Sequence, residues 1–234
     1  MPALTDFQIT RKWPAQYPDR IQLYSLPTPN GIKVSAMLEE TGLPYEPHLV
    51  DFGSNDQTSP EFLSLNPNNK IPAIIDPNGP NGEPLGLWES GAILIYLADK
   101  FGKLLAKDGA ERNEAIQWLM WQMGGFGPMS GQLGFFHKFA GKDYEDRRPF
   151  ERYRDEVKRL LRVLDQHLEG RDYITGSNYS IADIASWPWV GTINGFYEAA
   201  DQVDLGARKN VMRWYEACAN RPASQKAINI PARD

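Results

Sequence analysis

The segments with the character of β-strands all precede Ser90 in this chain. Residues 20–24 alternate polar and apolar side chains, residues 45–51 form a second candidate strand, and the short apolar runs 71–75 and 85–88 flank a loop rich in turn residues. Helical patterns separate the early strands and are the only patterns in the rest of the chain. The order β-α-β-α-β-β-α followed by helices predicts an α/β domain and then an all-helical domain.

These changes of pattern divide the chain into four segments. Residues 1–19 carry prolines without a clear period and are predicted to form an irregular N-terminal arm. Residues 20–102 form the predicted α/β domain, residues 103–109 a linker, and residues 110–234 the all-helical domain. A length of 234 residues suits two small domains of this kind.

Several helix boundaries follow from local signals in the second half of the chain. The clearest amphipathic helix is expected over residues 150–168, and Gly170 is expected to end it. Ser180 and Asp183 have the spacing of a capping box, which predicts that a further helix begins there. Residues 124–128 (GGFGP) are expected to break or bend the helix that precedes them.

The charge and composition argue against several classes of function. The formal net charge is −5 and no long basic run is present, so neither a nucleic acid nor an anionic membrane is expected as a partner. No apolar stretch approaches the ~20 residues that a membrane-spanning helix needs. The first residues lack the apolar core of a secretory signal. We therefore expect a cytoplasmic protein.

The cysteine and histidine content limits the chemistry of the protein's own side chains. The single cysteine, Cys218, cannot form an internal disulfide or a Cys-x-x-Cys redox pair, and is expected to be a packed apolar residue of a late helix. His48, His137 and His167 are scattered without the spacing of metal ligands, so no metal site is expected.

Short motifs in both halves carry a resemblance to a known family. They are residues 26–31 (LPTPNG), 66–73 (NPNNKIPA), 88–93 (WESGAI) and 179–184 (YSIADI). With the predicted order of elements, they resemble the cytosolic glutathione transferases, whose first domain is thioredoxin-like. The Thr-Pro-Asn of the first motif and residues 121–128 (WQMGGFGP) resemble the Nu class, bacterial and fungal relatives of the yeast nitrogen-regulation prion protein.

The turn after the first strand is the candidate catalytic position. Thr28 and Asn30 are expected between the first strand and the first helix, and each can donate a hydrogen bond to sulfur, although turns that open helices favour the same residues. The resemblance implies that both residues hold the thiolate of glutathione, where other classes of the family use Tyr or Ser. No cysteine lies in this turn, so any reacting thiol there belongs to a bound molecule.

The resemblance also implies a set of glutathione-binding residues in the first domain. In the family the proline that corresponds to Pro72 is cis, and the backbone of the preceding residue, here Ile71, pairs with the cysteinyl part of glutathione, with Lys70 beside it as a cation. Glu89 is implied to pair with the γ-glutamyl ammonium. Ser90 is expected to cap a helix, and the resemblance implies that it holds the γ-glutamyl carboxylate at that helix N-terminus.

Two further residues are assigned to glutathione binding by the resemblance alone. Gln57 lies in a polar loop and is implied to contact glutathione. Arg152 lies in the first turns of the long helix and is implied to reach a glutathione carboxylate from the helical domain, although an arginine on a charged helix face is usually only solvated. In Nu-class proteins two glutathiones can occupy one site.

The function that the resemblance implies is that of a glutathione-dependent disulfide-bond oxidoreductase, with glutathione as co-substrate, a small disulfide as substrate, and neither a metal nor a protein cysteine. One alternative is that the same pocket conjugates glutathione to electrophilic hydrophobic substrates, with aromatic residues of the helical domain as its wall, or supports a peroxidase activity. Another is a non-enzymatic glutathione-binding regulator, which the lack of an Asn/Gln-rich tail disfavours. The family is dimeric, so a homodimer is expected.

Overall fold

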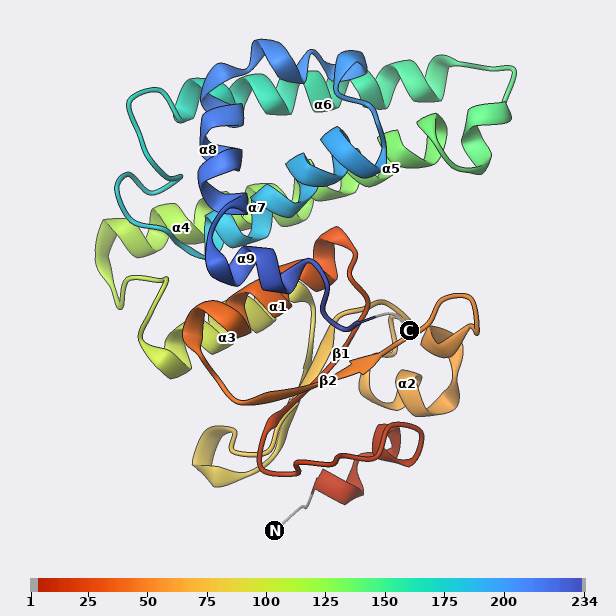
Figure 1. Cartoon of the computed structure of the whole chain (residues 1–234), viewed down its shortest axis with the longest axis vertical. Coiled ribbons are helices and arrows are strands. Elements are labelled where there is room, and N and C mark those ends of the chain that lie inside the picture. Colours follow the sequence, from red (N-terminus) through yellow and green to blue (C-terminus); the bar gives the residue numbers. More distant parts are fainter. Residues whose placement is uncertain (1–3, 233–234) are drawn as a thin grey trace. The chain divides into compact units, whose positions relative to one another are not determined.

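The computed structural model describes residues 4–232 of the chain (Figure 1). These residues form two compact units. Unit 1 comprises residues 4–101 together with residues 222–232, and unit 2 comprises residues 102–221. The C-terminal segment, which the sequence pattern groups with the helical domain, is therefore part of unit 1.

Unit 1 is built on a four-stranded mixed sheet with the strand order β2-β1-β3-β4. Strand β1 (Ile21–Ser25) pairs in parallel with β2 (Tyr45–Leu49), whereas β3 (Ala73–Asp76) runs antiparallel to both β1 and β4 (Leu85–Trp88). The helix between β1 and β2 supplies the crossover that a parallel pair requires. This arrangement confirms the predicted thioredoxin-like domain.

Helices cover the sheet of unit 1. Helix α1 (Pro29–Thr41) packs against α3 (Ser90–Phe101) and against the C-terminal helix α9 (Pro222–Ala227), and Figure 1 shows these three helices grouped together. Helix α2 (Pro60–Leu65) packs instead against the N-terminal arm and β4. Gly42 follows α1 with a φ of 70°, the left-handed conformation that ends a helix as its sequence position predicts.

The N-terminal arm is part of the core of unit 1. It contains two short 3₁₀ turns, Leu4–Asp6 and Gln8–Arg11, and buries Leu4 and Ile9 in an apolar cluster with Tyr24 and Phe62. Such burial ties the arm to the sheet, because each apolar side chain withdrawn from water stabilises the packed state by roughly 1.5–3 kcal/mol.

Apart from an isolated β-bridge between Tyr173 and Gly176, the regular secondary structure of unit 2 is helical in the residues that the structure describes. Its α-helices are α4 (Gly109–Trp121), α5 (Gly127–His137), α6 (Arg148–His167), α7 (Ile181–Gly191) and α8 (Lys209–Ala219). Short helical turns complete both units: Asp56–Thr58, Pro80–Gly82, Gln122–Phe126, Ala140–Asp143, Thr192–Phe196, Asp201–Val203 and Leu205–Ala207. Helix α6 confirms the long amphipathic helix of the sequence analysis to within two residues at each end.

The predicted interruption at residues 124–128 takes an unexpected form. The chain stays helical, and Gln122–Phe126 is a π-helical turn that joins α4 to α5. Pro128 lies in the first turn of α5, directly after the π-helical turn. Of the predicted break or bend, the break does not occur, because a wider π-helical turn accommodates the glycines and interrupts the regular α-helix.

The capping box of α7 is confirmed and extends into a buried network. Asp183 accepts the backbone N–H of Ser180 at 2.9 Å, the backbone N–H of Ile174 at 2.9 Å and the indole N–H of Trp214 at 2.7 Å. A fully buried carboxylate needs such partners, since desolvation alone raises its pKa. The local cap thus also joins α7 to α8.

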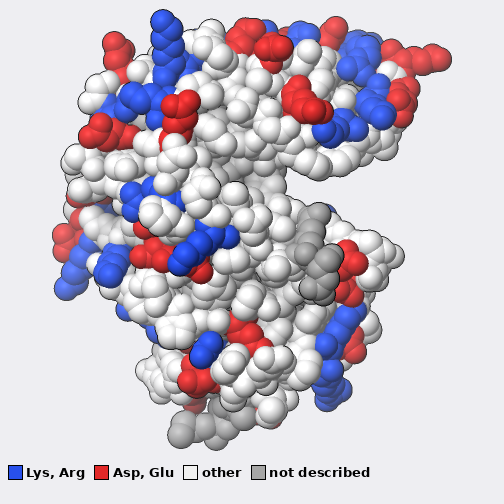
Figure 2. Space-filling model, in the orientation of Figure 1, with Lys and Arg blue, Asp and Glu red and all other residues white. Residues whose placement is uncertain are grey.

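Two surface properties bear on function. Acidic and basic side chains are interspersed over the visible face of the molecule in Figure 2, which matches the mixed charge of the sequence. No helix within residues 4–232 combines the length and the apolar character needed to cross a bilayer.

Candidate functional site

Most of the predicted site residues lie at one end of the strands of the unit 1 sheet. We call this end the sheet edge. In the strand register, Tyr24 of β1 lies opposite Ala73 of β3, and Ala73 lies opposite Trp88 of β4. The chain that follows β1, the chain that precedes β3 and the chain that follows β4 therefore meet at the same edge. These three segments carry Thr28 and Asn30, Lys70 to Pro72, and Glu89 and Ser90 respectively.

Thr28 and Asn30 belong to the N-terminal turn of α1. Thr28 is the N-cap, and its Oγ1 accepts the backbone N–H of Gly31 at 3.3 Å. Asn30 was expected between strand and helix, but it is the second residue of α1, because Pro29 already has the fixed φ of a first helical position. Both side chains thus stand at the positive end of a helix dipole, which favours an anion such as a thiolate.

Gly31 allows this turn to approach the end of β1. A Cβ atom at this position would lie 1.9 Å from the backbone oxygen of Leu26, far inside van der Waals contact. Only glycine fits there, so the residue sets how closely α1 begins beside the sheet.

The segment before β3 presents its backbone at the same edge. The Ile71–Pro72 peptide bond is cis, as the family resemblance implied, and both residues are buried. Lys70 is exposed, and its carbonyl accepts the side-chain amide of Asn66 at 2.5 Å. Asn66 thereby holds the loop in place, while the ammonium of Lys70 is turned to solvent.

The start of α3 differs in detail from the expectation. Ser90 is the first residue of α3, and Glu89 takes the capping position, with its carbonyl accepting the N–H of Ile93 at 2.9 Å. Glu89 has a φ of 71°, a left-handed conformation that non-glycine residues adopt rarely. The prediction that Ser90 is the cap was wrong, because the left-handed residue before it already supplies the first carbonyl of the helix.

Lys33 is a site residue that the sequence analysis missed. It is fully buried in α1, and its Nζ donates to Ser90 Oγ across 3.4 Å. Burial lowers the pKa of Lys33 to about 7, and the carboxylate of Glu89 opposes this shift. The signal available in the sequence was its spacing, because Lys33 lies one helical turn before Met37, which is buried.

Gln57 lies in the 3₁₀ turn Asp56–Thr58, which follows β2. Its side-chain oxygen Oε1 is buried and has no hydrogen-bond partner among residues 4–232. A buried acceptor without a donor is rare in native proteins and suits a site that a ligand N–H completes. The neighbouring Asp56 accepts the backbone N–H of Asp51 at 2.9 Å and pairs with Lys12 of the arm at 2.6 Å, which holds the turn in place.

Arg152 lies in unit 2, on the exposed side of α6. The guanidinium of Arg159 is the main cause of the lowered pKa of Glu156, and the charge of Arg152 adds to this effect. Its role in glutathione binding stays a prediction from the family resemblance.

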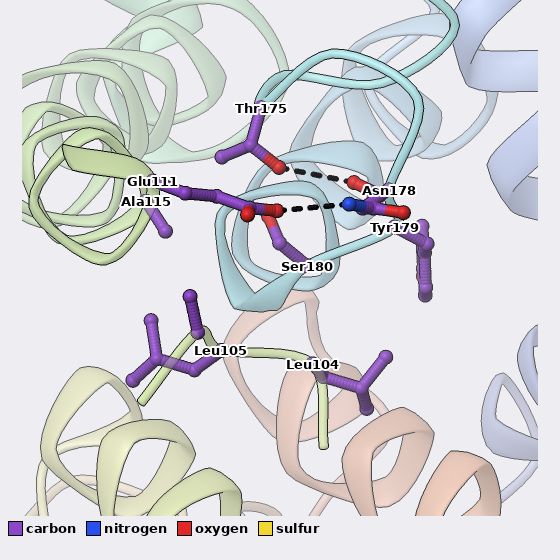
Figure 3. A pocket seen from close by; sticks show the side chains of 9 residues that line it. Leu104, Leu105, Glu111, Ala115, Thr175, Asn178, Tyr179 and Ser180 are labelled. Carbon is purple, nitrogen blue, oxygen red and sulfur yellow. Dashed lines mark hydrogen bonds between the residues drawn. The ribbon is translucent and has the colours of Figure 1, made fainter. Parts of the chain in front are cut away.

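Unit 2 contains a cavity of about 300 Å³ that does not coincide with these positions (Figure 3). Within it, Glu111 accepts the side-chain amide of Asn178 at 2.9 Å, and the hydroxyl of Thr175 donates to the carbonyl of Asn178 at 3.0 Å. The described residues that line it include none of the predicted site residues: Leu104, Leu105, Ala106, Glu111, Ala115, Thr175, Asn178, Tyr179 and Ser180. The cavity is therefore separate from the predicted site in the residues that form it.

The part of the chain that the structure describes holds no group of three or more His, Cys, Asp or Glu side chains that is suited to a metal ion. The groups that the sheet edge offers are backbone groups, hydroxyl and amide side chains, the carboxylate of Glu89, the exposed ammonium of Lys70 and the buried amine of Lys33.

Comparison with known proteins decides the family. Residues 20–99 match the glutathione S-transferase N-terminal domain, and residues 128–222 match the glutathione S-transferase C-terminal domain. The chain is 46% identical over 211 residues to the disulfide-bond oxidoreductase YfcG of Escherichia coli K12, a match that covers 89% of this chain and 94% of that protein. The chain belongs to the glutathione S-transferase family.

Two solved glutathione transferases are similar over almost their whole length. One, from Burkholderia graminis, is 66% identical with a TM-score of 0.98, covers 100% of this chain and 98% of its own, and is described with two glutathione molecules bound per subunit. The other, from Pseudomonas putida, is 60% identical with a TM-score of 0.97, covers 99% and 100%, and is described with one glutathione disulfide bound per subunit. The resemblance to the glutathione transferases, and to the Nu class among them, is confirmed.

Proposed function

We propose that this protein is a glutathione-dependent disulfide-bond oxidoreductase in which bound glutathione supplies the reacting thiols. The observation that carries the proposal is that the sheet edge offers two helix N-termini and a cis-proline segment, but no thiol of its own. The single cysteine, Cys218, is fully buried in α8 of unit 2. The names and bound ligands of the relatives described above support the same activity.

The reaction proceeds by two thiol–disulfide exchanges. The thiolate of one glutathione attacks a sulfur of the substrate disulfide, forms a mixed disulfide and releases one substrate thiolate, which takes up a proton. The thiolate of a second glutathione then attacks the glutathione sulfur of the mixed disulfide. This step releases the second substrate thiol and yields glutathione disulfide, so two glutathiones are oxidised for each disulfide reduced.

Thr28 and Asn30 are the proposed catalytic residues. A free thiol has a pKa of ~8.5, so only a minor fraction of glutathione is thiolate at neutral pH. The hydroxyl of Thr28 and the amide of Asn30 donate hydrogen bonds to the sulfur, and the N-terminus of α1 adds its dipole. Both effects favour the thiolate and align it for in-line attack.

The remaining predicted residues bind the peptide of glutathione. The backbone of Ile71, held before Pro72, pairs with the cysteinyl residue, with Lys70 beside it. Glu89 pairs with the γ-glutamyl ammonium and Ser90 holds the γ-glutamyl carboxylate. In this scheme the extended peptide pairs with the protein through main-chain hydrogen bonds, as in other cases of strand-like peptide recognition.

Gln57 and Arg152 complete the proposed binding residues. The buried Oε1 of Gln57 accepts a glutathione N–H, which gives that acceptor the donor it lacks among residues 4–232. Arg152 binds a glutathione carboxylate, for which the guanidinium group of arginine is suited because it can make a bidentate contact.

The proposal extends to assembly and location. The protein forms a homodimer, as its family does, and acts in the cytoplasm, where a reducing environment maintains glutathione as the thiol. Sedimentation at micromolar concentration tests the first statement, and a monomer there would contradict it.

Reduction of hydroxyethyl disulfide, coupled to the removal of glutathione disulfide, tests the activity. We expect turnover that depends on glutathione and persists in Cys218→Ala. Cys218 is fully buried in α8 and is none of the proposed site residues. A Cys218→Ala variant that folds normally but has lost the activity would overturn the proposal, as would a folded wild-type protein that binds no glutathione.

Conjugation of glutathione to an apolar electrophile is the second candidate function. It is favoured by a cluster of aromatic rings in unit 2, where Phe136 stacks on Tyr153 at 5.6 Å and meets Phe135 edge to face at 5.0 Å. Phe135 keeps 36% of its surface exposed, which makes it available to an apolar co-substrate. Turnover of a chloronitrobenzene well above that of hydroxyethyl disulfide would favour conjugation over reduction.

A further inference from the structure

We propose that Lys33 is a buried positioning residue for the α-carboxylate of a γ-glutamyl ligand, and that it takes up a proton when this ligand binds at the N-terminus of α3. The inference rests on the proposed function, which places the γ-glutamyl group of glutathione beside Glu89 and Ser90. It adds a charge to that site which neither the exposed residues nor the helix dipole supply.

The ammonium of Lys33 contacts the hydroxyl that is proposed to hold the carboxylate. Lys33 has no exposed surface and Ser90 only 3%, and Lys33 Nζ donates to Ser90 Oγ at 3.4 Å. Because this oxygen accepts from the ammonium, the hydroxyl hydrogen of Ser90 points away from Lys33. The contact also joins α1, which begins at the proposed thiol site, to α3, which begins at the proposed carboxylate site.

A buried ammonium is costly unless an anion accompanies it. The carboxylate of Glu89 acts on Lys33 from the β4–α3 junction and favours its charged form. On the elements packed against α1 and α3, two further lysines form ion pairs with other residues. On α9, Lys226 pairs with Glu39 at 3.4 Å, and at the far end of α3, roughly 15 Å from Ser90, Lys100 pairs with Asp76.

Lys33 is consequently poised between its two protonation states before the ligand binds. Burial has lowered its pKa to about 7, so a large share of the side chain is uncharged slightly above neutral pH. A carboxylate arriving at Ser90 adds a second negative charge close to the amine while the ligand ammonium occupies Glu89. This favours the charged form of Lys33, and by linkage the ligand binds together with a proton.

The arrangement selects for a specific ligand group. An α-carboxylate next to an α-ammonium satisfies both Lys33 and Glu89, whereas a peptide that lacks the carboxylate leaves Lys33 with the same partners as in the free protein. The site therefore discriminates for the γ-glutamyl end of a ligand by charge as well as by shape.

Calorimetric titration with S-methylglutathione tests the inference, since this probe has the γ-glutamyl group but no thiol that titrates. Heats measured near pH 7.5 in two buffers of different ionisation enthalpy give the number of protons taken up per ligand. The amino group of the probe also titrates, so the decisive quantity is the difference between wild type and Lys33→Met. We expect wild type to take up roughly half a proton more.

Lys33→Met keeps an unbranched side chain in the buried position while removing the charge. It is expected to bind the probe about tenfold more weakly, the factor that corresponds to one pKa unit. Lys226→Met is the matched control, because it removes an ammonium of α9 whose side chain is 70% exposed, and it should keep wild-type affinity and proton uptake.

A second probe keeps the test independent of the variant. An S-methyl peptide with 4-aminobutyryl in place of γ-glutamyl lacks only the α-carboxylate, and wild type should bind it more weakly and take up fewer protons. Equal proton uptake for the two probes, or equal uptake and affinity in wild type and Lys33→Met, would overturn the inference while glutathione binding itself stands. A lack of any binding heat with folded wild type would instead overturn the proposed function.

Discussion

Lys12 of the N-terminal arm forms an ion pair with Asp56, the residue immediately before Gln57, with 2.6 Å between Nζ and Oδ1. The other carboxylate oxygen of Asp56 accepts the backbone N–H of Asp51. The arm therefore braces the turn that carries the unpartnered acceptor of Gln57. This contact gives the arm a role in the site, although it contributes none of the proposed ligand contacts.

Removing this brace should weaken glutathione binding more than turnover. Lys12→Met is expected to raise the KM for glutathione about fivefold with little change in kcat, because a partly exposed ion pair contributes about 1 kcal/mol. Steady-state kinetics with hydroxyethyl disulfide measure both constants. Lys107→Met, at an exposed position of unit 2, is the control. A change in kcat alone would show that the arm does not act through the binding of glutathione.

Asn30→Ala should raise the pKa of the bound glutathione thiol. Loss of one hydrogen bond to the sulfur is expected to move that pKa up by about one unit, which corresponds to about 1.4 kcal/mol. Ultraviolet absorbance of the thiolate, followed against pH in the complex, reports this value directly. Asn68→Ala, in the loop before β3, provides the comparison. A thiol pKa that is the same in wild type and Asn30→Ala would remove Asn30 from the catalytic residues.

Gly31→Ala should disrupt the start of α1. The new Cβ would meet the backbone oxygen of Leu26, which cannot rotate away as a side chain does, so we expect a loss of about 3 kcal/mol or more in the free energy of unfolding. Urea denaturation measures the loss. Gly124→Ala is the matched control, because nothing lies within 4 Å of the Cβ it would add. Similar stability for the two variants would contradict the close approach of α1 to β1.

The stability of the wild-type protein should depend on pH through Lys33. The pKa of Lys33 is lowered from 10.5 in the unfolded chain to about 7, so between these values the unfolded state binds more protons than the folded state. Stability therefore rises with pH across this window, relative to a variant without the amine. Urea denaturation gives the free energy of unfolding of wild type and of Lys33→Met between pH 7 and pH 9. The value for wild type minus the value for Lys33→Met should increase with pH. A constant difference would mean that Lys33 titrates normally in the folded protein.

Local patterns in the sequence were sufficient for many of the elements. The amphipathic repeat predicted α6, the Ser180–Asp183 spacing predicted the start of α7, and the turn-rich loop between two apolar runs predicted the β3–β4 hairpin. Each of these features depends on residues close together in the chain, because side-chain periodicity, caps and turns act within a few residues. The catalytic turn and the cis-proline segment were identified by resemblance to the family.

The tertiary structure decided which residues that are distant in the sequence become neighbours in space. Lys33 and Ser90 are far apart in the sequence, and they meet because the strand order brings the helices after β1 and β4 together at one edge of the sheet. The left-handed backbone of Glu89, rather than the local preference of serine for capping, determined which residue caps α3. The sequence alone thus determined the elements and the family of this protein. Burial and long-range contacts, which depend on the packed fold, determined the charge at its site.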